Sequence, residues 1–146
     1  MRLDERQVFD EVCESMLELA KKSNVPHMVI SIEGDRDVRV VPLGNPAGIV
    51  HAVQQVKHMI RGRCRAVILV GEYEQKKAGS DELRHVLVAI LFRKKEATVR
   101  MWHLSDSGEG RAVSERPEEY TAKQHEIVAG GMNFFDVFDT EADYIA

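Results

Sequence analysis

The sequence predicts an α+β domain in which a single mixed or antiparallel sheet of about five strands is packed by two main helices. Three observations predict this fold class. Residues 8–20 repeat apolar side chains at helical spacing, residues 45–62 carry the start and stop signals of a second helix, and residues 65–104 hold three short apolar runs separated by polar breaks. The expected order is α-β-β-α-β-β-β with a short C-terminal element.

The first helix has a clear start. Asp4 is placed to cap it, and Gln7 stands three residues later as the reciprocal partner of a capping box. Lys21 and Lys22 come last, where cations suit the helix dipole. The expected apolar face comprises Val8, Phe9, Val12, Met16, Leu19 and Ala20.

A hairpin and a second helix follow. Residues 27–33 alternate apolar and polar side chains, and the turn at Gly34 leads to a second extended run at 38–41. Asn45 before Pro46 is typical of an N-cap with proline in the first helical position, and we expect this helix to end at Gly62.

The central strands come next. Residues 66–70 are apolar and rich in β-branched side chains, which predicts a buried strand, whereas the polar residues 74–80 predict an exposed loop. Residues 86–92 are seven consecutive apolar residues, and such a run fits either a strand or a buried helix. We favour a strand, because Val86, Val88, Ile90 and Phe92 would form one face and Leu87, Ala89 and Leu91 the other, and residues 98–104 offer an alternating partner.

The last third of the sequence is less regular. Residues 105–111 are rich in Gly and Ser and predict a loop, and Pro117 is well placed to begin a helical turn within residues 114–124. Residues 127–128 suggest a short edge strand. We expect one globular domain over residues 1–132 and a separate acidic, Phe-rich segment over residues 133–146.

Composition and charge limit the classes of function. The formal net charge is −4, and residues 133–146 account for that excess with Asp136, Asp139, Glu141 and Asp143. The balanced body argues against a nucleic-acid partner, which needs basic residues gathered on one face. No apolar run is long enough to cross a bilayer, and two distant cysteines favour a reducing compartment. We therefore expect a cytoplasmic protein without a membrane partner.

One group of polar residues would suit metal-dependent catalysis. Asp37 (or Asp35) in the hairpin, together with Glu72, Glu74 and Lys76, would suit Mg²⁺ binding and the positioning of a water for phosphodiester cleavage. The alternative interpretation is a solvated strand end, which we favour.

This group resembles the active site of the restriction-endonuclease-like nucleases. The resemblance covers the Glu-x-Lys unit at residues 74–76 and one upstream aspartate. In that family the two parts come from consecutive paired strands, whereas here a predicted helix intervenes. The resemblance implies a nuclease-like hydrolase, which stands as the alternative function.

The remaining chemistry-bearing residues form no recognisable motif. The six histidines show no zinc spacing, and the glycines match neither a P-loop nor a dinucleotide fingerprint, so we expect no metal and no cofactor. Cys64 stands between Arg63 and Arg65, a setting that would lower its pKa and favour the thiolate. We interpret both cysteines as packing residues.

The closely spaced Phe134, Phe135 and Phe138 are the candidate interaction residues. They suit either docking to a partner or packing of a terminal helix on the core of this chain. With the open sheet edges that short strands imply, they favour a non-catalytic interaction or assembly module that associates with itself or with another protein. A small ligand is left unassigned.

Overall fold

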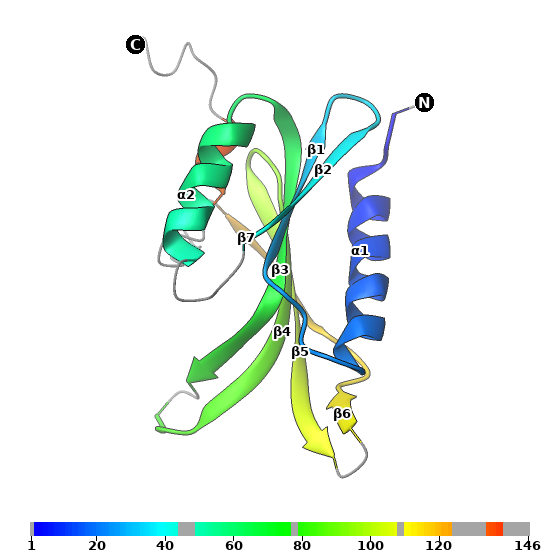
Figure 1. Cartoon of the computed structure of the whole chain (residues 1–146), viewed down its shortest axis with the longest axis vertical. Helices are drawn as coiled ribbons and strands as arrows, with labels where there is room; N and C mark the ends of the chain where they lie inside the picture. Colours follow the sequence, from blue (N-terminus) through cyan, green and yellow to red (C-terminus); the bar gives the residue numbers. More distant parts are fainter. Residues whose placement is uncertain (1, 44–48, 77–78, 108–109, 124–133, 139–146) are drawn as a thin grey trace.

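A seven-stranded antiparallel sheet separates two helical layers in the computed structural model, which describes residues 2–43, 49–76, 79–107, 110–123 and 134–138 (Figure 1). The strand order is β2-β1-β3-β4-β5-β6, and β7 pairs with another part of β5. The strands are β1 (Met28–Glu33), β2 (Asp37–Pro42), β3 (Cys64–Lys76), β4 (Leu83–Phe92), β5 (Glu96–Ser107), β6 (Gly110–Val113) and β7 (Glu118–Lys123).

Helix α1 (Glu5–Ala20) covers one face of the sheet (Figure 1). It begins as predicted, because the Asp4 side chain accepts a hydrogen bond of 3.0 Å from the Gln7 backbone N–H. Its buried side chains pack on the even-numbered residues of β1 and β3 and on the odd-numbered residues of β4. This layer forms the larger of two cores, which includes Phe9, Cys13, Met16, Ile30, Ile32, Ile68, Leu87, Leu91 and Trp102.

Helix α2 (Ile49–Ile60) and the short 3₁₀ helix η2 (Phe135–Phe138) cover the opposite face (Figure 1). The Phe92 ring lies 5.7 Å from the Phe134 ring and 5.3 Å from the Phe135 ring, between ring centroids. The backbone N–H of Gly62 also donates to the Val137 carbonyl at 2.9 Å, so η2 is fixed to the end of α2. The second core also includes Val29, Val53, Val56, Ile60, Val67, Leu69 and Phe138.

The structure confirms the α+β class, the first hairpin and the strand at residues 86–92, which lies inside β4. The count of about five strands is wrong. Strand β3 continues to Lys76 and so includes residues 74–76 of the expected loop, because β4 pairs with it as far as Leu83. Strand β6 occupies part of the loop expected at 105–111, and β7 replaces the helical turn expected after Pro117.

Two expected features fall outside the described residues. These are the Asn45–Pro46 helix start and the edge strand at residues 127–128. Within the described part, α2 covers Ile49–Ile60, inside the range predicted for it. No helix in that part is both long and apolar enough to span a membrane.

Candidate functional site

Strand β2 lies at the end of the sheet and pairs with β1 alone among the described strands. The backbone N–H of Leu43 donates to the His27 carbonyl at 2.9 Å, one pair beyond the end of the β1–β2 ladder. Hydrogen-bonded and non-hydrogen-bonded pairs alternate in an antiparallel ladder. The odd-numbered residues of β2 therefore direct their backbone groups toward β1, and the even-numbered residues direct theirs outward.

The outward backbone groups belong to Val38, Val40 and Pro42. Proline carries no N–H, so its place at an outward position leaves the β1–β2 ladder intact. Val38 and Val40 each present one N–H and one C=O along the free edge. No described strand pairs with this edge, and an edge of this kind can accept another extended strand.

The side chains of β2 divide between the two faces. Val38 and Val40 point to the face that carries α1, and their exposed fractions are 43% and 57%. Asp37 and Arg39 point to the other face. The Arg39 guanidinium binds the Glu33 carboxylate at 2.9 Å, whereas no ion-pair partner for Asp37 is found among the described residues. Asp37 stands directly opposite Glu33, so two acidic residues face each other across the hairpin.

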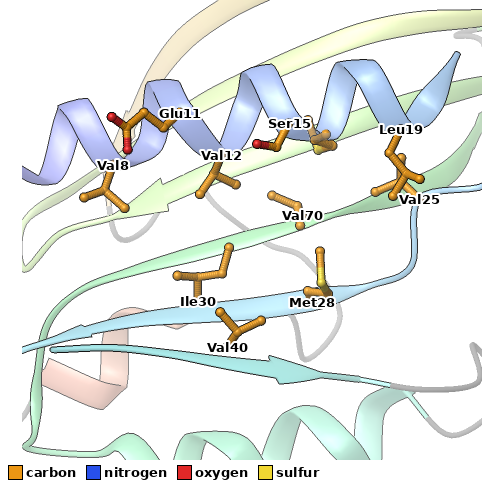
Figure 2. Close-up of a pocket in the computed structure, with 11 residues that line it drawn as sticks. Val8, Glu11, Val12, Ser15, Leu19, Val25, Met28, Ile30, Val40 and Val70 are labelled. Carbon is orange, nitrogen blue, oxygen red and sulfur yellow. The ribbon is translucent and has the colours of Figure 1, made fainter.

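An apolar hollow of about 320 Å³ adjoins this edge beneath α1 (Figure 2). Val8, Val12 and Leu19 of α1 point down toward the strands. Ile30 of β1 and Val40 of β2 lie below them. The hollow joins exposed apolar side chains to a free strand edge, and the two features together define a candidate interaction surface.

A second polar cluster surrounds the Glu72 carboxylate on β3. Arg111 of β6 binds both carboxylate oxygens, with its Nη1 2.9 Å from Oε2. His85 Nε2 lies 2.9 Å from Oε1, and the Val25 backbone N–H also donates to the carboxylate. Arg111 in addition donates to the Ser23 carbonyl at 2.8 Å. The cluster therefore ties the end of α1 to the middle of the sheet.

These partners stabilise the ionised form of Glu72. Burial alone would raise the pKa of this carboxyl, because its side chain is only 8% exposed. The hydrogen bond and the positive charge of Arg111, with the Val25 N–H and His85, outweigh burial and lower the pKa of Glu72 below its ordinary value. Its two oxygens are occupied by protein donors, which suits a structural role.

The neighbouring residues of β3 hold the His27 ring. His27 Nε2 lies 2.7 Å from the Glu72 carbonyl oxygen, and the ring stacks on Tyr73 with 4.6 Å between centroids. A Cβ atom at Gly71 would fall 2.0 Å from His27 Cδ2, so only glycine fits beneath the ring. Burial raises the pKa of the Tyr73 hydroxyl.

Of the four candidate catalytic residues, Glu72, Glu74 and Lys76 lie along β3, whereas Asp37 lies far from them on β2. Asp37 pairs with Glu33 of β1, and Glu33 in turn pairs with Cys64 at the start of β3. Glu72 lies eight residues after Cys64 along β3, roughly 25 Å away. Glu74 is exposed, and Lys76 pairs with Asp81 at 3.3 Å. Among the described residues, no group of three His, Cys, Asp or Glu side chains is arranged to hold a metal ion.

The pKa shift expected for Cys64 is wrong in direction. Burial raises the pKa of this thiol to about 11. The neighbouring Arg65 directs its guanidinium to Glu5, at 2.8 Å, and to the Leu3 and Gly34 carbonyls. Burial also raises the pKa of Cys13.

Phe134, Phe135 and Phe138 lie buried against the sheet of their own chain, with exposed fractions of 0%, 2% and 9%. Their role in binding a partner stays a prediction. Val38 and Val40 on the edge of β2 are, by contrast, among the exposed large apolar side chains. No sequence signal marked Val38 and Val40 as exposed, because an edge strand and an inner strand share the same alternating pattern.

Arg100 of β5 is another residue that no sequence pattern singled out. Its guanidinium lies between α1 and β7, bound to Asp10 at 2.8 Å and to Glu119 at 2.6 Å, above the Phe9 ring. Burial alone would lower the pKa of Arg100, but the hydrogen bonds to Glu119 and Asp10 outweigh burial and raise this pKa above its ordinary value. This residue fastens α1 to the sheet and is too enclosed by protein partners to act as a binding group.

Comparison with known protein families, with curated proteins and with solved structures finds no match to this chain.

Proposed function

We propose that this chain is a non-catalytic assembly module that forms a homodimer by antiparallel pairing of two β2 edges. The observation that carries the proposal is the free edge of β2, where Val38 and Val40 present their backbone N–H and C=O groups outward. Exposed edges of this kind are normally paired or covered. Most soluble homo-oligomers are two-fold symmetric, and an antiparallel strand pair has that symmetry.

The pairing register follows from backbone direction and charge. Residues that face each other in hydrogen-bonded pairs must both direct their backbone groups outward, so even-numbered residues pair with even-numbered residues. A two-fold axis at Val38 places Asp37 of each copy opposite Arg39 of the other. These two pairs are of the closer, non-hydrogen-bonded kind, in which cross-strand charges interact most strongly.

Other registers are less favourable. An axis at Val40 would set the Val38 carbonyl of one copy against Pro42 of the other, which has no N–H to donate. An axis at Arg39 would set two arginines directly opposite each other, and like charges in that position destabilise strand pairing. The axis at Val38 avoids both penalties and gives Asp37 the cation it lacks within its own hairpin.

The hydrolase alternative has weaker support. Asp37 lies far from Glu72 and Glu74, and Glu72 is already occupied by Arg111 and His85. Cleavage of DNA or RNA with Mg²⁺ or Mn²⁺, lost on the substitution Glu74→Ala, would restore it. We expect neither the wild type nor the Glu74→Ala variant to cleave DNA or RNA.

A proline at Val38 tests the dimer. Val38→Pro removes an outward N–H that the monomer does not use, so the fold should persist while the central hydrogen bonds of the dimer are lost. We expect the wild type to be a dimer and this variant a monomer, measured by size-exclusion chromatography with light scattering. Val38→Thr keeps both the N–H and the β-branched shape and is the matched control, expected to stay dimeric. A wild type that is monomeric at tens of micromolar, or a dimeric Val38→Pro, contradicts the proposal.

A further inference from the structure

The apolar hollow beneath α1 is a recess with a buried base and an open mouth. Helix α1 makes its main contacts with β3, β4 and β6, so the face formed by β1 and β2 extends past the helix. Val70 and Ile30 at the base are 0% and 5% exposed, whereas Leu19 and Val40 at the mouth are 38% and 57% exposed. The hollow therefore reaches under the helix and differs from a flat apolar patch (Figure 2).

The lining of this hollow offers a bound molecule almost only apolar surface. All of its lining residues except Glu11 and Ser15 are aliphatic or methionine. Figure 2 shows the Glu11 carboxyl turned away from the apolar side chains. Burial of apolar surface is therefore the main source of affinity that the hollow provides.

The charged groups beside the hollow select no charged ligand. A polar hollow of about 580 Å³ adjoins the apolar one and shares Val8 and Glu11 with it. Its charged lining residues are two arginines and two acids, namely Arg2, Arg36, Asp4 and Glu11. These four formal charges cancel, so a charged ligand would lose hydration without meeting an excess of the opposite charge. The balance favours an uncharged ligand.

The volume of the apolar hollow favours a small molecule over a segment of another chain. An apolar cavity of about 150 Å³ binds benzene, so a volume of about 320 Å³ suits a molecule of about ten to twelve non-hydrogen atoms. A single turn of α-helix, about 10 Å wide and 5.4 Å long, displaces about 400 Å³. A helix from a second copy or another protein therefore does not fit inside the hollow.

We propose that the hollow beneath α1 binds a compact, uncharged and largely hydrocarbon molecule of about ten to twelve non-hydrogen atoms, the class that includes bicyclic aromatics and monoterpenoids. The molecule lies between Val12 and Leu19 of α1 on one side and Ile30 and Val70 of the sheet on the other. For a ligand of this size we expect a dissociation constant of about 0.1–1 mM. The site uses side chains of one copy and does not rest on the proposed dimer.

Titration of the full chain with 2-naphthalenemethanol, followed by NMR of its ¹³C-labelled methyl groups, tests the proposal. The methyl signals of Val12, Leu19 and Ile30 should shift saturably, while that of Val53 in the opposite core should not. The charged analogues 2-naphthoate and 2-naphthylmethylammonium should bind about fivefold or more weakly. Benzyl alcohol lacks the second ring and should bind about tenfold or more weakly.

Three outcomes overturn the proposal. The first is the absence of saturable shifts with 2-naphthalenemethanol at about 1 mM. The second is a charged analogue that binds as tightly as the alcohol or more tightly. The third is a shift of the Val12 and Leu19 signals when the protein concentration alone is raised, because a second copy would then cover the hollow.

One variant with a matched control locates the site. Leu19→Gln replaces apolar surface at the mouth of the hollow and should weaken binding of 2-naphthalenemethanol by about fivefold or more. Leu83→Gln makes the same change at an exposed leucine that does not line the hollow, so its affinity should equal that of the wild type. Circular dichroism of both variants checks that they are folded. Equal losses from the two substitutions would place binding elsewhere and contradict the proposal.

Discussion

Two oppositely charged variants of β2 should each be monomeric alone and should dimerise when mixed. Asp37→Arg gives a strand with arginines at 37 and 39, and Arg39→Asp gives one with aspartates at both positions. In the proposed register each homodimer would place like charges opposite one another twice, whereas the mixed dimer would place opposite charges there. Replacing attraction by repulsion at two symmetric pairs weakens each homodimer by about 2–4 kcal/mol, or roughly 30- to 1,000-fold.

Sedimentation velocity of each variant and of their equimolar mixture measures this outcome. Glu18→Lys makes the same change in net charge as Asp37→Arg on an exposed part of α1 and is expected to remain dimeric. Since Arg39→Asp also removes the ion pair with Glu33, its thermal unfolding should be checked beside that of the wild type. A mixture that stays monomeric, while both variants are folded and the wild type dimerises, would rule out the register centred on Val38.

Replacing Glu72 with alanine should lower the free energy of unfolding by about 3 kcal/mol. The substitution removes the carboxylate that the Arg111 guanidinium binds, and removing one member of a largely buried ion pair is strongly destabilising. It also removes the acceptor of the Val25 N–H and the partner of His85. Urea denaturation followed by circular dichroism measures the change.

Glu74→Ala is the matched control for this substitution. Glu74 lies two residues further along the same strand but is exposed, so its loss should change the free energy of unfolding by no more than about 0.5 kcal/mol. Equal effects of the two substitutions would show that the contacts of Glu72 contribute no more than an exposed carboxylate does.

The pKa of Glu72 also predicts how stability changes with pH. Its pKa in the folded protein lies below the ordinary value of 4.5, so the folded state binds a proton less readily than the unfolded state. This carboxylate therefore stabilises the fold fully above pH 4.5, and the contribution is lost as the pH falls through the lower, folded-state pKa. Glu72→Gln should lose less stability than the wild type between about pH 6 and pH 3. A variant that follows the acid unfolding curve of the wild type would contradict this assignment.

The elements that could be predicted from the sequence are those whose signals are local. Asp4 and Gln7 marked the start of α1 because a helix cap depends on residues only three positions apart. The hairpin of β1 and β2 was likewise evident from its turn. Strands β6 and β7 were missed because they are short and carry mostly polar or exposed side chains, which resemble loop sequences.

The candidate surface could be predicted only in part. Short strands implied a free sheet edge, but which strand lies at the edge depends on pairings between residues far apart in the sequence. The outward direction of Val38 and Val40 depends further on the pairing of Leu43 with His27. Glu72 and Arg111 are 39 positions apart, and no local pattern indicates that β3 and β6 bring them together.

The far side of the sheet has a consequence for how large an assembly can grow. The outer edge of β5 is divided between β6, along Leu104–Ser107, and β7, along Glu96–Met101. No described strand there presents one long continuous edge that matches the free edge of β2. Two copies joined through β2 would therefore use up their matching edges on each other, and the assembly would stop at a closed pair instead of extending into a fibre.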